Sequence, residues 1–271
     1  NAYNVAVGDS AGNAVTTGTS NLLLGALAGD ALTAASHNTA VGTAALTTDT
    51  LGSKSTAIGK NALAVQNFTT ATDSFNVAVG HETGLSVTTG IRNTIVGALA
   101  GDALTDADDN TVFGYNALSN DTLGSKTVAI GRSVLSSQNF TTATDTYNTV
   151  VGYGAGGQVT TGKDNTILGG LAGDALTTGE LNVVLGRSAL GADTKGNRAV
   201  AIGYAALQTQ NFTTSTESYN VAIGYGAGSS VTTGKYNTFI GGLAGDAVMN
   251  GEHNVAIGLE ALTTEDGHGK N

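Results

Sequence analysis

A short motif, Asn-x-apolar-apolar-Gly, recurs along almost the whole 271-residue chain. Its glycines stand at positions 8, 25, 42, 59, 80, 97, 114, 131, 152, 169, 186, 203, 224, 241 and 258, and in three of these fifteen copies Ser55, Thr127 or Ala199 replaces the Asn. Three short steps alternate with one longer step, so four motifs form a superrepeat that starts again at Gly80, Gly152 and Gly224. A fixed short period of this kind is typical of a solenoid, in which each repeat forms one coil that stacks on the next.

The residues inside the motif favour strands. The coils are too short for a pair of helices, and the apolar triplets before each Gly are rich in Val, Ile and Thr. Proline, which would remove a hydrogen-bond donor from stacked strands, does not occur in the sequence. We therefore expect an all-β fold, a parallel β-solenoid of about fifteen coils, with 1–271 as one continuous domain of a longer fibre protein. The small residue three positions after most glycines, such as Ala28 or Ala45, is expected to mark a return strand.

The strand triplets are apolar on both faces. The residue directly before each Gly is large, as in Leu24, Ile58 and Phe113, and this face is expected to line the coil interior. The residue before it points the opposite way and is never polar. Because one coil has only one interior, we expect another chain to bury that second row at an oligomer axis. The candidate axis residues are Ala6, Leu23, Ala40, Ala57, Ala78, Ile95, Val112, Ala129, Val150, Ile167, Val184, Ala201, Ala222, Phe239 and Ala256.

The motif, followed by Ala-Leu or Ala-Gly, resembles the head repeats of trimeric autotransporter adhesins of the YadA type and the related repeats of bacteriophage tail fibres. The length of the coil and the segments Ala45-Leu46, Ala117-Leu118 and Ala189-Leu190 look more like the tail-fibre version. The resemblance implies a left-handed β-roll and a homotrimer around a common axis. It also implies an extracellular fibre, on a virion or a bacterial surface, whose partner is a host-surface glycan or protein.

Every fourth coil carries a four-residue extension, at Gln66–Thr70, Gln138–Thr142 and Gln210–Thr214. These segments are expected to protrude, and aromatic residues in a polar loop can anchor a receptor. In the alternative, the phenylalanines tuck back against the roll and close the longer turn. The candidate receptor contacts are Asn67, Phe68, Asn139, Phe140, Asn211 and Phe212.

Composition argues against several classes of function. The chain has no Cys and four His, and 11 Lys and Arg stand against 21 Asp and Glu, a net charge of -10. Thiolate metal sites, nucleic acid and anionic membranes are therefore not expected as partners, and no apolar stretch is long enough to span a membrane. Gly-Asp recurs once in every superrepeat, at Asp30, Asp102, Asp174 and Asp246, but without a calcium-loop pattern, so turn aspartates that hydrogen-bond backbone amides are the preferred interpretation.

The segment Gly157–Asp164 nearly matches a phosphate-binding loop but lacks its Ser or Thr. With no positioned catalytic set in the sequence, we expect a non-enzymatic chain without cofactor or metal. A second hypothesis is a monomeric solenoid that binds ice or a polysaccharide through a flat, Thr-rich face. Thr occupies the first triplet position at Thr39, Thr56, Thr94, Thr111, Thr149, Thr166 and Thr238, where it alternates irregularly with Val.

Overall fold

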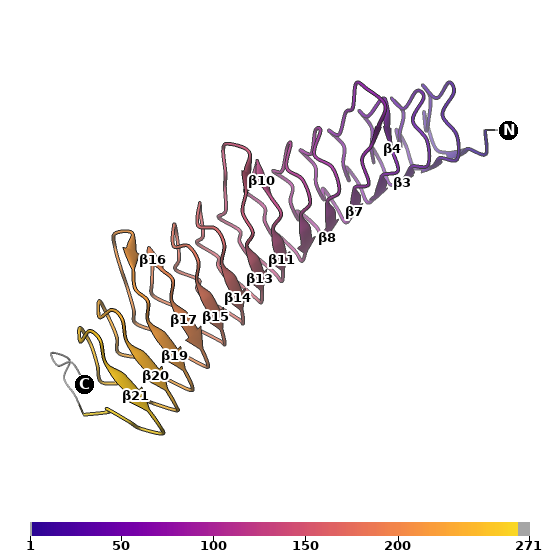
Figure 1. The fold of residues 1–271 in the computed structure, drawn as a ribbon. Coiled ribbons are helices and arrows are strands. Elements are labelled where there is room, and N and C mark those ends of the chain that lie inside the picture. The colour runs from indigo at the N-terminus through magenta and orange to yellow at the C-terminus, as the bar shows by residue number, and fades with distance from the viewer. Residues whose placement is uncertain (1, 265–271) are drawn as a thin grey trace. The chain divides into compact units, whose positions relative to one another are not determined.

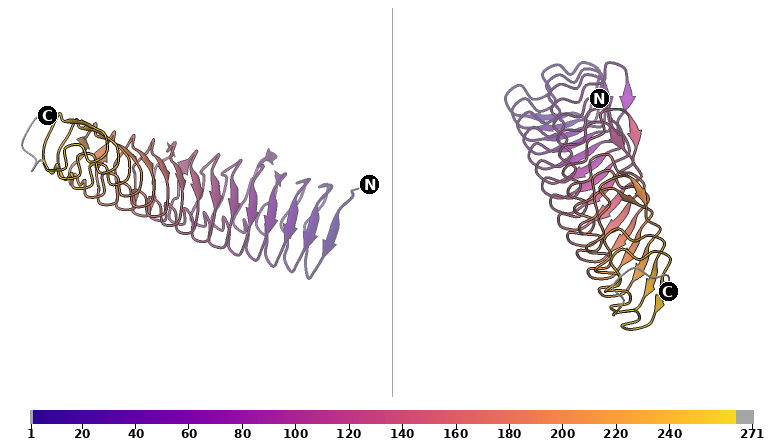
Figure 2. Two further views of the ribbon diagram at one scale, coloured as in Figure 1. Left: turned by 90° about the horizontal axis from the view of Figure 1, so that it is seen from below. Right: turned by 90° about the vertical axis from the view of Figure 1, so that its left-hand side faces the viewer.

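The computed structural model describes residues 2–264, and the regular elements of this part of the chain are all strands. The chain divides into two compact units, residues 2–132 with 139–145, and residues 133–138 with 146–264. In each unit, successive coils stack with one strand apiece in a row (Figures 1 and 2). The prediction of a parallel β-solenoid with one coil for each motif is confirmed.

The first unit contains eight in-register parallel strands, one from each motif. They are β1 (Val5–Val7), β2 (Leu22–Leu24), β3 (Thr39–Val41), β5 (Thr56–Ile58), β7 (Val77–Val79), β8 (Thr94–Val96), β9 (Thr111–Phe113) and β11 (Val128–Ile130). Two short parallel pairs accompany them, β4 (Gly52–Ser53) with β6 (Thr72–Asp73) and β10 (Gly124–Ser125) with β12 (Thr144–Asp145). The short pairs occur where one of the extended coils follows an ordinary one.

The second unit repeats this arrangement. Its parallel strands are β13 (Thr149–Val151), β14 (Thr166–Leu168), β15 (Val183–Leu185), β17 (Val200–Ile202), β19 (Val221–Ile223), β20 (Thr238–Ile240) and β21 (Val255–Ile257). Its short pair is β16 (Gly196–Asn197) with β18 (Thr216–Glu217). The three-residue strands of each unit, without the short pairs, together form what we call the strand wall.

The segment after each strand is a ladder of turns, and the predicted return strand is wrong. Ala45 N donates to Gly42 O at 3.3 Å, which closes a tight turn. Its neighbours Ala44 and Leu46 adopt left-handed conformations, with φ of 55° and 53°. The amide of Ala44 reaches Ala26 O of the preceding coil at 2.9 Å, whereas the amide of Leu46 reaches Ala62 O of the following coil at 3.0 Å. The left-handed residues thus let this turn wall make inter-coil hydrogen bonds without an extended backbone.

The interior of each coil lies between the strand wall and the turn wall. The middle residue of each strand points into it, and only the first of them, Ala6, is exposed. The expected orientation of the triplets was therefore wrong. The residues that lie inside the coils, instead of facing an oligomer axis, are Leu23, Ala40, Ala57, Ala78, Ile95, Val112, Ala129, Val150, Ile167, Val184, Ala201, Ala222, Phe239 and Ala256.

Complementary volumes explain why small residues can fill this core. Where the strand wall carries Ala40 or Ala57, the turn wall contributes the buried Leu46 or Leu63. Where the strand wall carries Phe239, the turn wall has Gly245, and a Cβ added there would overlap the phenylalanine ring. In these coils the size of a strand-wall residue is matched to the size of the turn-wall residue that faces it across the narrow interior.

The motif asparagine is buried and links neighbouring coils. Asn21 Oδ1 accepts from Asn38 N of the next coil at 2.9 Å, and Asn38 Nδ2 donates to Gly52 O, near the end of its own coil, at 2.9 Å. Asn38 Oδ1 in turn accepts from Ser55 N at 2.8 Å. An amide side chain is suited to this position because it provides a donor and an acceptor together. The recurrence of Asn in the sequence thus reflects a hydrogen-bonded ladder inside the roll.

Candidate functional site

The outward surface of the strand wall is an apolar face. It consists of the first and third residues of each triplet, and we call it the outer strand face. Every one of these residues is exposed or half-buried, whereas the middle residues of β2 onward are buried. The third position is occupied by Val7, Leu24, Val41, Ile58, Val79, Val96, Phe113 and Ile130 in the first unit and by Val151, Leu168, Leu185, Ile202, Ile223, Ile240 and Ile257 in the second.

The first position of each triplet adds Val, Leu or Thr beside this row. In-register pairing places like residues in line, with Leu24 beside Val41 and Thr39 beside Thr56. Leu24 is 44% exposed, Phe113 39% and Ile240 37%. No charged residue interrupts the outer strand face in either unit. The outward apolar row is thus the one that the sequence had assigned to the coil interior, and its burial by another chain stays a prediction.

The long coils do not present their phenylalanines to solvent. Phe68, Phe140 and Phe212 are 5%, 6% and 6% exposed. A Cβ added at Gly52 would lie 2.7 Å from Phe68 Cδ2, so this ring covers the glycine of β4. The alternative that the rings tuck against the roll is correct, and the proposed receptor contact through these phenylalanines is wrong.

The asparagines that precede these phenylalanines remain at the surface. Asn67, Asn139 and Asn211 are exposed. Each accepts a hydrogen bond at 3.1 Å through Oδ1, from the hydroxyl of Thr50, Thr122 and Thr194 respectively. Their role as receptor contacts stays a prediction.

A buried carboxylate holds each long coil in place. Asp49 Oδ1 accepts from Gly52 N at 2.9 Å and from Phe68 N at 3.1 Å, and Gln66 Nε2 donates to Asp49 Oδ2 at 2.6 Å. Gln66 Oε1 accepts from Asn76 Nδ2 at 2.9 Å, which joins the carboxylate to the asparagine ladder. Burial raises the pKa of Asp49 above its ordinary value, and these hydrogen bonds offset the rise only in part.

The same arrangement recurs with the superrepeat. Asp193 accepts from Gly196 N and Phe212 N, each at 3.0 Å, and from Gln210 Nε2 at 2.6 Å. Asp121 accepts from the amides of Gly124 and Phe140. These carboxylates are not among the residues predicted from the sequence. Their signal was an Asp that stands one ordinary coil before the Gln that begins each long segment, at positions 49, 121 and 193.

The Gly-Asp aspartates are not gathered into a metal site. Asp30 Oδ1 accepts from Thr47 Oγ1 of the next coil at 2.6 Å, rather than from a backbone amide. Asp102 and Asp246 each bury one carboxylate oxygen without a hydrogen-bond partner. Burial raises the pKa of Asp102 and Asp174. Among residues 2–264, no group of three or more His, Cys, Asp or Glu side chains is close enough to hold a metal ion.

No family model matches the chain, and no curated protein matches it. The described part of the chain contains no long, apolar helix that could span a membrane. The outer strand face is therefore the feature of the molecule that best indicates a function.

Proposed function

We propose that this chain is a segment of a non-enzymatic extracellular fibre, in which three copies bury their outer strand faces against one another. The segment serves as a stiff spacer in a phage tail fibre or bacterial surface adhesin and takes part in attachment to a host surface. The single observation that carries this proposal is the uninterrupted row of apolar third-position residues on the outer strand face of each unit. The number three and the extracellular setting come from the resemblance of the repeat to adhesin heads and tail fibres.

Burial of this face by other copies has a clear energetic reason. Removing a Val, Leu, Ile or Phe side chain fully from water contributes about 1.5–3 kcal/mol, and the residues here are already partly covered. The third-position residues of each unit together therefore supply a favourable free energy that opposes the loss of freedom on association. Monomeric soluble proteins rarely leave an apolar patch of this kind open to solvent.

One observation favours the second candidate function. Thr149 pairs with Thr166 in register on the outer strand face, as a regular Thr array on an ice- or polysaccharide-binding solenoid would. The next residue in that row is Val183, however, and the adjoining third-position row contains no Thr. The outer strand face is therefore better suited to contact with another apolar surface than to ordered water.

A charge placed on the outer strand face tests the proposal. Ile130→Lys points outward from β11 and is 37% exposed in the single chain, so the coil should fold but the assembly should not form. Burying the unpaired ammonium at an apolar interface costs several kcal/mol per copy. Analytical ultracentrifugation should show lower-mass species, with the circular dichroism spectrum preserved.

Thr142→Lys is the matched control. It adds the same charge on the neighbouring long loop, at an exposed position off the outer strand face. This variant should assemble like the unmodified chain. Normal assembly of Ile130→Lys would contradict the proposal.

A further inference from the structure

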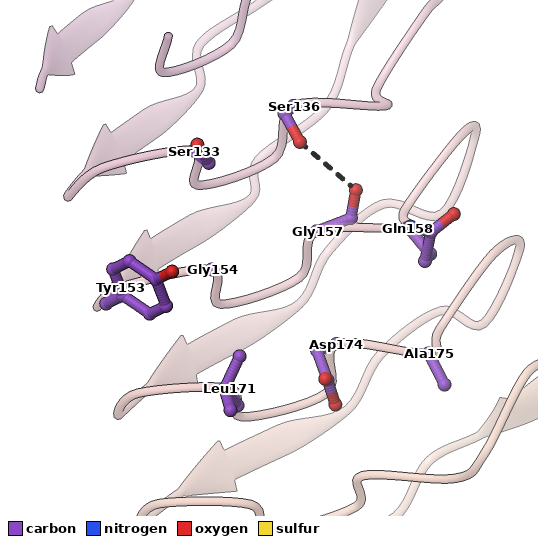
Figure 3. A pocket seen from close by; sticks show the side chains of 9 residues that line it. All are labelled: Ser133, Ser136, Tyr153, Gly154, Gly157, Gln158, Leu171, Asp174 and Ala175. Carbon is purple, nitrogen blue, oxygen red and sulfur yellow. Dashed lines mark hydrogen bonds between the residues drawn. The ribbon is translucent and has the colours of Figure 1, made fainter. Parts of the chain in front are cut away.

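The turn wall of the second unit carries a hollow that the repeat does not require. It has a volume of about 400 Å³ and lies among Tyr153, Gly154, Gly157, Gln158, Leu171 and Asp174. Figure 3 shows Tyr153 and Leu171 on one side of it, Gln158 on the other, and Asp174 on the coil that follows. Tyr153 is 57% exposed and Leu171 is 37% exposed. A broad aromatic surface and several hydrogen-bonding groups thus meet in one depression.

A second hollow continues the first across the next coils. Its volume is about 470 Å³, and it shares Leu171 and Asp174 with the first hollow while adding Ser188, Gly191 and Gln208. Equivalent positions two coils apart are separated by roughly 10 Å, because stacked strands lie about 4.8 Å apart. We call the two hollows together the turn-wall groove. It lies within the second unit and follows the stacking direction of the coils.

The backbone beneath the turn-wall groove is fixed by hydrogen bonds between coils. Leu171 N donates to Tyr153 O at 2.9 Å, Gln158 N to Asp174 O at 3.1 Å, and Ala192 N to Gln208 O at 3.1 Å. Ser136 Oγ also contacts Gly157 O at 3.5 Å (Figure 3). A site built on this fixed backbone loses little conformational freedom when a ligand binds, which favours affinity.

Glycines open the first hollow, and the same positions are filled one superrepeat earlier. Glu82 and Leu85 are the residues there that correspond to Gly154 and Gly157. Glu82 has a φ of 55° and Gly154 a φ of 61°, so the backbone conformation is shared although the side chain differs. The glycines are therefore not needed for the turn. What they change is the space above it.

The groups around the turn-wall groove match the surface of a neutral sugar chain. The Tyr153 ring and Leu171 offer an apolar platform for the C–H face of a pyranose, the Asp174 carboxylate accepts from hydroxyl groups, and the Gln158 and Gln208 amides both donate and accept. An anionic polymer is disfavoured by Asp174 and by the net charge of -10. We propose that the turn-wall groove binds a neutral oligosaccharide along the stacking direction, an inference that rests on the attachment role proposed above.

The test measures binding of cellohexaose, maltohexaose and chitohexaose to the assembled full chain by saturation-transfer NMR and calorimetry, with a heparin hexasaccharide as the anionic comparison. At least one neutral probe should bind, and more tightly than the heparin fragment. Tyr153→Ala should weaken binding about tenfold, because it removes the stacking surface. Gly157→Leu, which introduces the residue found at position 85, should weaken binding at least as much by filling the hollow.

Tyr225→Ala is the matched control, because Tyr225 is the equivalent residue one superrepeat later and does not line either hollow. It should leave binding unchanged. Absence of binding by all neutral probes, or binding by Tyr153→Ala and Gly157→Leu equal to that of the unmodified chain, would overturn the proposal. Ultracentrifugation of the same samples separates the two claims: an assembled chain that binds no sugar refutes the groove alone, and a sugar-binding monomer supports the groove and refutes the trimer.

Discussion

Asn182 illustrates how a single polar side chain connects three coils. Its Oδ1 accepts from Ala199 N at 2.9 Å, and its Nδ2 donates to Gly196 O at 3.0 Å and to Asn165 Oδ1 at 3.1 Å. The side chain is fully buried, so water cannot replace any of these contacts. The motif Asn is therefore required to satisfy the hydrogen bonds of buried polar groups within the roll, and not for a function at the surface.

We predict that Asn182→Ala lowers the free energy of unfolding by about 1–3 kcal/mol, because it leaves the Ala199 amide buried without an acceptor. The measurement is urea unfolding followed by circular dichroism. Ala199 itself occupies the motif position of the next coil, which shows that Ala is tolerated sterically there. A variant as stable as the unmodified chain would mean that the ladder contributes nothing.

The buried carboxylates Asp49 and Asp193 give a pH prediction of definite sign. Burial raises the pKa of both above the ordinary value of 3.8, so the folded chain binds these protons more tightly than the unfolded chain. Their contribution to stability is therefore greatest at low pH and is lost as the pH rises through the folded pKa. Compared with Asp49→Asn/Asp193→Asn, the unmodified chain should gain stability on acidification from neutrality towards pH 3.8.

Urea midpoints measured for both proteins across this range check the prediction, and the difference between them isolates the two carboxylates from the other acidic groups. The prediction would be contradicted if the unmodified chain lost stability relative to the double variant on acidification. Asp109 behaves in the opposite way, because the Arg92 guanidinium lowers the pKa of that half-buried carboxylate.

At the scale of the coil, the packing is a set of matched volumes between two walls. Phe239 on the strand wall lies against Gly228 and Gly245 on the turn wall. Ala40 and Leu46 represent the reverse combination. In these two coils one wall supplies the large side chain and the other wall a small residue, so a change on one wall should be compensated by a change on the other.

We predict that Phe239→Ala lowers the free energy of unfolding by about 3–5 kcal/mol, because it leaves a cavity in the narrow core. Phe239→Ala/Gly245→Leu should recover part of this loss, since it recreates the Ala and Leu combination of the third coil. Phe239→Leu serves as the conservative control, because Leu23 occupies the same position in the second coil. A double variant that is less stable than Phe239→Ala would show that the two walls are not interchangeable.

The elements also show which parts of the fold the sequence could reveal. The spacing of Asn and Gly predicted the coils and strands because each motif makes the same inter-coil contacts. The direction of the triplets was misjudged because large residues such as Ile130 were assumed to face the core, whereas the narrow interior accepts Ala129. The turn wall could not be predicted from residue preferences, because residues such as Leu46 do not favour the left-handed conformation they adopt.

The candidate sites were predictable to different degrees. That both faces of the triplets are apolar followed from the sequence, although the outward row was misidentified. The tucked position of Phe212 depends on Asp193, a contact between coils that only the three-dimensional stacking brings together. The turn-wall groove depends on glycines that replace larger residues of the repeat, and their effect on the space above the turn is visible only with the backbone in place.

At the scale of the whole molecule, the outer strand face links the fold to the proposed assembly. Within each unit, every coil adds two outward residues to the same face, so its apolar surface grows with every repeat. The turn-wall groove lies on the other wall of the coil, across the shared core. Assembly through one wall and recognition through the other are therefore compatible within the same chain.

The mass of the chain in solution, measured by light scattering after removal of a trimerising expression tag, tests this account most directly. If the outer strand faces are buried against one another, the mass stays at three times 26.8 kDa after the tag is cleaved. A stable monomer of 26.8 kDa with an intact solenoid spectrum would contradict the account, because the apolar face would then be open to solvent.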